Sequence, residues 1–118
     1  MEAVFNAEGE VTAWRDGDEV YTLAGEATAF LDGEIVYSYE DGTVLGWLVD
    51  GNYRDLDGDV VAFQSNAQGG PLKPLQQLRP LEPLRALTPL RPLRALEPLR
   101  PLFSFEWSSL EWDEWISQ

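Results

Sequence analysis

V-F-N-A-E-G-E-V-T-A-W, at residues 4–14, is the first copy of a short phrase that the chain repeats three more times. The other copies read V-Y-T-L-A-G-E-A-T-A-F at 20–30, V-Y-S-Y-E-D-G-T-V-L-G-W at 36–47 and Y-R-D-L-D-G-D-V-V-A-F at 53–63. Aligned on their central glycines, the copies follow one another at intervals of 16, 17 and 16 residues. Self-similarity at a short period is typical of a repeat architecture, so these four phrases decide the fold.

Each copy contains two turn signals. The first is the central glycine with the residue before it, and the second is an Asp-Gly pair, or Ser65-Asn66 after the fourth copy. Asp-Gly suits a two-residue type I′ hairpin turn, because that turn needs positive φ at both central positions. The intervening segments are rich in Val, Tyr, Trp, Phe and Thr. Residues 1–67 are therefore predicted to form an all-β domain of eight short antiparallel strands in four hairpins of about 16 residues each.

Period-two alternation sorts the side chains of these strands onto two faces. Small residues recur at equivalent places, namely Ala13, Ala29, Gly46 and Ala62. One aromatic set recurs as Trp14, Phe30, Trp47 and Phe63. A second set, at a spacing of 16, is Phe5, Tyr21, Tyr37 and Tyr53. Small residues near an axis, with aromatic residues filling wedges between units, predict a pseudo-fourfold arrangement of the hairpins.

The period changes to three in the proline-rich tract, residues 68–102. Its eight prolines exclude an α-helix or a central strand, because each lacks an N–H donor and fixes φ near −65°. The natural conformation is polyproline II, which has three residues per turn and would align the leucines in one stripe. The stripe consists of Leu72, Leu75, Leu78, Leu81, Leu84, Leu87, Leu90, Leu93, Leu96, Leu99 and Leu102.

The leucine stripe is the candidate association element. A straight tract would approach ~100 Å, which is too long for one small domain to cover. We expect either that the tract bends back at Gln77, Ala86 and Ala95, or that it associates with further copies as a homo-oligomer or with another protein partner. A semi-rigid linker is the alternative, although a linker needs no unbroken apolar stripe.

The segment 103–118 is predicted to pack back on the β domain. It first alternates aromatic and polar residues, which indicates a short strand. Ser108, followed three residues later by Glu111, then matches the capping box of a helical turn. That turn would place Trp112 and Trp115 on one apolar face.

The net charge of −13 is unevenly distributed along the chain. Residues 1–70 contain 15 acidic and 2 basic side chains, residues 71–102 contain 6 basic and 2 acidic ones, and residues 103–118 contain 4 acidic ones. The acidic surface argues against nucleic-acid and membrane partners, and the basic tract is expected to attract the acidic parts. Because neither a signal peptide nor an apolar run of ~20 residues is present, the expected location is cytoplasmic.

The residue types argue against an enzyme. The chain has no histidine and no cysteine, so we assign no catalytic residue, no metal ligand and no cofactor. The stretch Asp55-Leu56-Asp57-Gly58-Asp59 is similar to the start of a calcium-binding loop, but its glycine is at the fourth position and not the sixth. We interpret it as a hairpin turn, and the other carboxylates as turn and solubility residues.

The chain resembles the 4-fold beta flower protein family. The resemblance rests on the opening V-F-N-A-E-G-E, on A-F-Q-S-N-A-Q-G-G-P-L at 62–72, on the proline-rich tract and on F-S-F-E-W-S-S-L-E-W at 103–112. It implies a small all-β fold of four similar units around a pseudo-fourfold axis, and it implies no activity. The expected function is therefore a non-enzymatic structural or protein-interaction module.

Choline- and glucan-binding repeats of bacterial surfaces offer an alternative function. The chain is similar to them in its short hairpins with Gly46-Trp47 and Val36-Tyr37. Such aromatic residues form cages for quaternary ammonium groups. The candidate ligand residues would be Trp14, Phe30, Trp47, Phe63, Tyr21, Tyr37 and Tyr53. The competing interpretation is that these side chains form the core.

Overall fold

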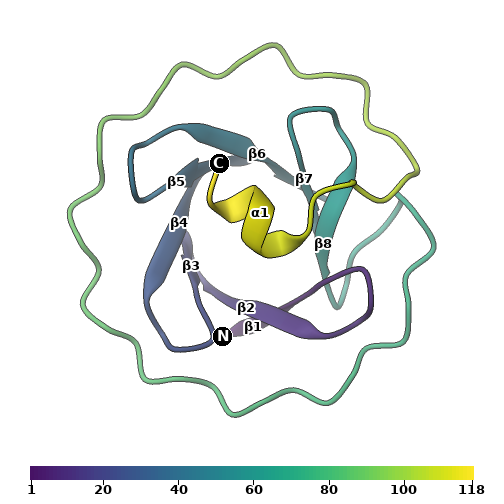
Figure 1. The fold of residues 1–118 in the computed structure, drawn as a ribbon, viewed down its shortest axis with the longest axis horizontal. Coiled ribbons are helices and arrows are strands. Elements are labelled where there is room, and N and C mark those ends of the chain that lie inside the picture. Colours follow the sequence, from purple (N-terminus) through teal and green to yellow (C-terminus); the bar gives the residue numbers. More distant parts are fainter.

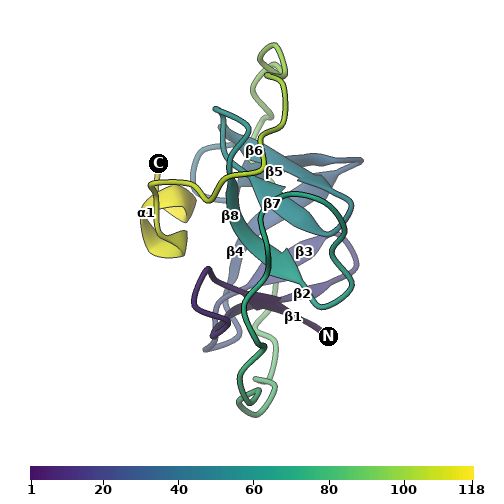
Figure 2. The same cartoon turned by 90° about the vertical axis from the view of Figure 1, so that its right-hand side faces the viewer.

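The protein is a closed β-barrel with one short helix over one end (Figures 1 and 2). The computed structural model describes residues 1–118. The strands are β1 (Glu2–Phe5), β2 (Val11–Asp16), β3 (Glu19–Tyr21), β4 (Ala27–Asp32), β5 (Ile35–Ser38), β6 (Val44–Val49), β7 (Asn52–Arg54) and β8 (Val60–Gln64), and the helix is α1 (Trp112–Ile116). All neighbouring strands are antiparallel, and β1 also pairs with β8, which leaves no open sheet edge. The predicted all-β fold is confirmed.

The pairing register shifts once between β1 and β2, and again between β3 and β4, β5 and β6, and β7 and β8. The shifts follow equivalent residues, namely Val4, Val20, Val36 and Tyr53. A bulge of this kind bends its strand and increases the local twist. Strands of three to six residues need such bends to close into a barrel.

The turns differ from the predicted type I′ geometry at all but one site. Only Asp50-Gly51, between β6 and β7, has positive φ at both central residues. At Gly17 and Gly33 only the glycine, which is the first central residue, has positive φ, as in a type II′ turn. A type II′ turn accepts any ordinary residue second, and here that residue is Asp18 or Glu34. The longer loops of the first series likewise have positive φ only at their glycines.

The barrel interior is lined by valine and alanine from the odd and even strands, respectively. Val4, Val20 and Val36 belong to one buried cluster with Ala13, Ala29 and Ala62. In β6 the corresponding residue is Gly46. A glycine is needed there because the backbone of β7 lies too close to leave room for a side chain. A Cβ atom there would lie 1.8 Å from the carbonyl oxygen of Arg54. The small residues predicted near the axis therefore do line the interior.

Tyr53 lies in the barrel interior and is not a member of the second aromatic set. It precedes the register shift of its hairpin, as valine does in the other three copies, and Arg54 is paired with Trp47 of the neighbouring strand. Its spacing of 16 from Tyr37 is misleading, because the third copy has one additional residue before Gly42. The second set is thus three aromatic residues and an arginine.

The helix α1 closes one end of the barrel (Figure 2). Trp115 is fully buried, and its Nε1 donates a hydrogen bond of 2.8 Å to the carbonyl oxygen of Leu45. The ring of Trp112 lies edge-on to Tyr53 with a centroid distance of 5.6 Å. The shared apolar face of the two tryptophans is therefore as predicted. With five residues, α1 is far too short to cross a bilayer, and the structure contains no helix that could do so.

The start of α1 differs from the prediction. The capping box joins Glu111 and Glu114, and not Ser108 and Glu111, so the helix begins at Trp112. The strand predicted before it is reduced to one parallel bridge between Trp107 and Val60. The segment has no longer ladder because β8 is already paired on both sides, with β7 and β1.

The tract runs around the circumference of the barrel as a ring (Figure 1). Residues 72–102 contain neither helix nor strand. Seen from the side, the ring encircles the barrel while α1 projects from one end (Figure 2). The tract is therefore not a straight rod, because the longest dimension of the whole molecule is 37 Å, and it follows the barrel as in the first of the two expectations.

Candidate functional site: the leucine rim

The leucines of the tract point away from the barrel and form what we call the leucine rim, which is every third residue from Leu72 to Leu102. Each leucine is between 91% and 98% exposed. Burial of the stripe within the chain, one of the two expectations, is therefore wrong. The side of the tract that meets the barrel includes half-buried prolines at equivalent positions, namely Pro74, Pro83, Pro92 and Pro101.

Four backbone hydrogen bonds attach the ring to the barrel at intervals of nine residues. The donors are the N–H groups of Gln77, Ala86, Ala95 and Ser104. The acceptors, in the same order, are the carbonyl oxygens of Gly9, Gly25, Gly42 and Gly58, at 2.8, 3.0, 2.9 and 3.2 Å. The three places where we expected a bend are thus points of attachment. Proline cannot occupy them, because it has no N–H to donate.

The same four glycines form sockets for the tract. In each socket a leucine carbonyl oxygen lies where a Cβ atom would be, at 2.0 Å for Gly9, 2.1 Å for Gly25, 2.0 Å for Gly42 and 2.6 Å for Gly58. The carbonyl groups belong to Leu75, Leu84, Leu93 and Leu102. Any side chain at these glycines would push the ring away from the barrel.

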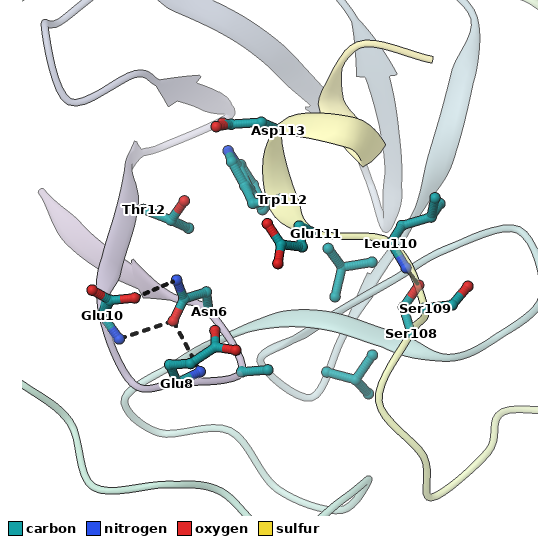
Figure 3. A pocket seen from close by; sticks show the side chains of 13 residues that line it. Asn6, Glu8, Glu10, Thr12, Ser108, Ser109, Leu110, Glu111, Trp112 and Asp113 are labelled. Carbon is teal, nitrogen blue, oxygen red and sulfur yellow. Dashed lines mark hydrogen bonds between the residues drawn. The ribbon is translucent and has the colours of Figure 1, made fainter.

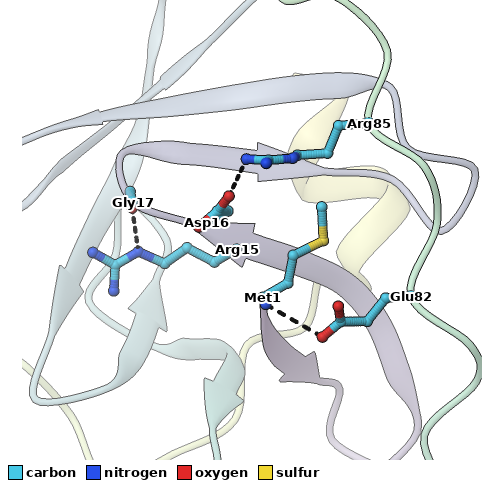
Figure 4. A network of polar contacts seen from close by, with 6 residues as sticks. All are labelled: Met1, Arg15, Asp16, Gly17, Glu82 and Arg85. Atoms are coloured by element: carbon cyan, nitrogen blue, oxygen red, sulfur yellow. Dashed lines mark hydrogen bonds and ion pairs between the residues drawn. The ribbon is translucent and has the colours of Figure 1, made fainter.

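Arginines of the tract pair with carboxylates of the barrel. Arg85 binds Asp16 and Arg94 binds Asp32, each next to a hairpin turn. Figure 4 shows the first pair beside a second contact, in which the amino terminus of Met1 donates to Glu82 over 3.2 Å. The predicted attraction between the basic tract and the acidic barrel is present in these pairs. They are exposed, so each contributes little free energy and mainly fixes which part of the ring meets which hairpin.

In a third ion pair, between Arg91 and Glu19, the carboxylate is more buried than in the first two. Arg91 donates to Glu19 over 2.6 Å, and the hydroxyl of Tyr39 donates to the other oxygen of Glu19. Burial, followed by this hydrogen bond to a carboxylate, raises the pKa of Tyr39 above its usual value. Tyr39 therefore stays a neutral donor and links β3 to the loop after β5.

Arg100 and Trp47 share one carboxylate of the tract. Both donate to the same oxygen of Glu97 over 2.7 Å, and Arg100 also donates to Glu34 over 2.8 Å. The hydrogen bond from Arg100, and then that from Trp47, lowers the pKa of Glu97. Glu97 thus remains an acceptor, and this carboxylate of the tract gives the indole N–H of the fully buried Trp47 its hydrogen-bond partner.

Arg54 fastens the end of the ring. Only 6% of this residue is exposed, and its Nη1 donates to the carbonyl oxygens of Gly58 and Ser104 over 2.7 and 2.8 Å. Its guanidinium lies 4.5 Å from the ring centroid of Phe103. Burial lowers the pKa of Arg54, and nearby carboxylates led by Asp59 oppose that shift. Arg54 stands in the fourth copy where the other copies have an aromatic residue, and it holds the end of the tract against the β7–β8 loop.

The seven candidate ligand aromatics are all buried, with exposed fractions of 0–5%. Basic side chains of the tract already cover several of the outer rings. Arg91 lies 4.8 Å from the centroid of Phe30, Arg100 lies 5.7 Å from Trp47, and Lys73 lies 5.9 Å from Phe63. A choline-like cation would have to displace these groups. Ligand binding by the aromatic sets stays a prediction, which quenching of tryptophan emission by choline would test.

A cavity of about 370 Å³ lies between α1 and the loop from β1 to β2 (Figure 3). Its lining includes the side chains of Glu10, Glu111 and Asp113. Asn6 shapes the loop, since its Oδ1 accepts the backbone N–H groups of Glu8 and Glu10, both over 3.0 Å. No three acidic side chains in the structure are placed to bind a metal ion.

Asp55 has a structural role in its loop. It is 4% exposed, and its carboxylate accepts the backbone N–H groups of Asp57 and Asp59 over 2.9 and 3.0 Å. It also accepts the hydroxyl of Ser108, which joins the β7–β8 loop to the segment before α1. This geometry agrees with the hairpin-turn interpretation of the calcium-like stretch.

The period of nine in the tract was missed by sequence reasoning, although a signal for it is present. Before each leucine, proline is the usual residue, but Gln77, Ala86 and Ala95 interrupt the series at intervals of nine. These interruptions mark the positions that must donate an N–H. The period of three dominates the sequence and conceals them.

Fold and rim together define a class of small closed β-barrel that is encircled by its own proline- and leucine-rich tract. The sequence model of the 4-fold beta flower protein family matches residues 2–116, and the chain belongs to this family. The resemblance drawn from the sequence is therefore confirmed. No curated protein and no solved structure matches the chain.

Proposed function

We propose that the protein is a non-enzymatic structural or protein-interaction module and that the leucine rim is its association surface. The observation that carries this proposal is the exposure of eleven leucines, each above 90%, on a tract fixed to the barrel at four points. Soluble monomers rarely expose contiguous apolar patches above a few hundred Å². Specific attachment of the tract keeps the leucines outward, so their exposure is built into the fold.

We also infer that the tract has polyproline II geometry and that four hairpin units surround a pseudo-fourfold axis. The leucine period of three, with every leucine on the same side, supports the first inference. The four equivalent register shifts and the four glycine sockets support the second. In this geometry a leucine recurs roughly every 9 Å along the rim.

A non-enzymatic role is supported by what the polar side chains already do. Asp55 shapes a loop, Glu97 accepts from Trp47, and Asp16 and Asp32 bind arginines of the tract. The chain also has neither histidine nor cysteine to serve as a nucleophile or general base. The carboxylates are thus employed in structure and in the charge of the surface.

The energetics of the rim indicate how much of it must be engaged. Burying one leucine fully contributes roughly 1.5–3 kcal/mol. Two convex rims meet along a short arc, so each would contribute roughly two or three leucines spaced as in polyproline II. Association costs an estimated 4–15 kcal/mol in lost freedom of motion. A single rim-to-rim contact is therefore marginal, and stable association must engage more of the rim.

The test replaces four leucines of the rim, Leu84, Leu87, Leu90 and Leu93, by serine. The matched control replaces the same four by methionine, which keeps the apolar area. We expect the mass of the parent protein and of the methionine variant to rise with concentration, while the mass of the serine variant, which keeps seven of the eleven leucines, rises much less. Because the leucines do not touch the barrel, the melting temperature and the protease resistance of the tract should be unchanged in both. A serine variant with the mass distribution of the parent would refute the proposal.

A further inference from the structure

The leucine rim has no preferred side. The molecule is a flat disc of 37 × 36 × 22 Å, and the tract surrounds it almost completely (Figure 1). Leucines are equally exposed outside every part of the barrel, from 91% at Leu75 to 98% at Leu78 and 95% at Leu102. A surface of this shape offers the same contact in all lateral directions.

The face of the disc that carries α1 differs from the rim in charge. Six of the 21 acidic side chains lie in ion pairs, and the other fifteen do not. The pairs with the tract involve acidic residues at or next to the turns that follow the even strands, such as Asp16 and Asp32. At the α1 end, Glu8, Glu10 and Asp113 surround a cavity and form no ion pair. Like charges oppose stacking of two discs through their α1 faces.

We propose that copies of this chain pack edge to edge through the leucine rim into an open planar array one molecule thick. The proposal rests on the proposed function, since it names the partner that covers the same rim. One rim contact is marginal, so a second copy alone leaves most leucines in water. Neighbours on several sides bury them together, and a contact repeated around a rim does not close into a ring of fixed size.

A second copy fits the rim better than a bilayer does. The hydrocarbon core of a membrane is about 30 Å thick, whereas the rim is a single row of leucines. Arg85 and Arg94 lie next to leucines in that row and are half-exposed, with side-chain exposures of 54% and 50%. Their charges would lie in the hydrocarbon if the rim were inserted. Between two discs, the same arginines remain paired with Asp16 and Asp32 of the barrel, beside the leucine contact.

The experiment compares three forms of the full chain by sedimentation over a concentration series and by electron microscopy. The forms are the parent, a half-rim variant and a full-rim variant in which all eleven leucines become serine. The half-rim variant changes only one continuous arc, Leu81, Leu84, Leu87, Leu90 and Leu93. We expect sheets one disc thick from the parent above a threshold concentration, pairs or short clusters from the half-rim variant, and monomers from the full-rim variant.

Each other outcome has a defined meaning. A parent that forms only a discrete dimer or tetramer, or a half-rim variant that still forms sheets, overturns the planar array but leaves the leucine rim as an association surface. A parent that stays monomeric at all concentrations overturns both proposals. A parent that floats with neutral phosphatidylcholine vesicles in a leucine-dependent manner, and forms no sheets, assigns the rim to a membrane and also overturns the array. Methionine at all eleven positions should restore the sheets if apolar area is what drives them.

Discussion

At the scale of single residues, the four socket glycines meet two separate requirements. Each has positive φ, and each also lies against a carbonyl oxygen of the tract. Gly33 meets only the first requirement, because its φ is +62° and nothing lies within 4 Å of the place of its Cβ atom. Gly33 is therefore a control that separates the energetic effect of positive φ from the effect of contact with the tract.

We expect Gly25→Ala to destabilise the protein more than Gly33→Ala does. Alanine at position 33 should cost about 1–2 kcal/mol from its positive φ alone. Alanine at position 25 should cost on the order of 3–4 kcal/mol, because the carbonyl of Leu84 must also move and a hydrogen bond of the ring is lost. Urea unfolding gives both values. Equal losses would show that the ring does not depend on the socket.

At the scale of elements, the tract is fixed by backbone contacts every nine residues and not by its leucines. Proline occupies two of the three possible positions in each nine-residue unit, as at Pro83 and Pro89, and the third position is Ala86. The N–H of Ala86 binds the carbonyl oxygen of Gly25. A more regular polyproline sequence would therefore attach to the barrel less well than the natural one.

We expect Ala86→Pro to loosen the ring, although it makes the proline pattern more complete. The loss of one N–H donor, with an acceptor left partly unsatisfied, should cost about 1–3 kcal/mol. Thr88→Pro is the matched control, because the N–H of Thr88 makes no hydrogen bond within the protein. Limited proteolysis of the tract should be faster for the first variant and unchanged for the second. Equal proteolysis of the two would mean that the attachment at Gly25 contributes nothing.

At the scale of the whole molecule, the barrel, the ring and α1 form one packing unit. Trp115 of α1 belongs to the same buried cluster as the valines and alanines of the barrel interior. The ring is tied to the barrel loops, and its end is tied to Arg54. A barrel of about 65 residues is near the lower limit for an independent core, so the other two parts complete it.

We expect Trp115→Ala to weaken all three parts together. Removal of a fully buried tryptophan should cost about 3–5 kcal/mol. Phe105→Ala, which truncates a residue that is 79% exposed, should change stability by less than about 0.5 kcal/mol. Tryptophan emission and protease protection of the tract should report one shared urea transition, shifted only by the first variant. A tract that stays protected after the barrel has unfolded would contradict a single unit.

Local patterns in the sequence determined a large part of this architecture. Turn glycines, period-two alternation and β-branched residues depend on neighbours a few residues away, so the eight strands and the buried aromatic residues could be predicted from them. The stripe of leucines was equally visible, because a period of three needs no tertiary contact to be recognised. The apolar face of α1 followed from the spacing of Trp112 and Trp115.

The tertiary structure alone decided how these parts are combined. Closure of β1 on β8 and the pairing of Arg54 with Trp47 depend on register between strands. The path of the tract depends on its contacts with glycines some 45 to 70 positions earlier in the chain. Prolines, backbone N–H donors and arginines of the tract contact the barrel, so they take up the inner side of the ring. The leucines are therefore left on the outer side. Their outward direction follows from packing between distant segments, which the periodicity of the tract cannot specify.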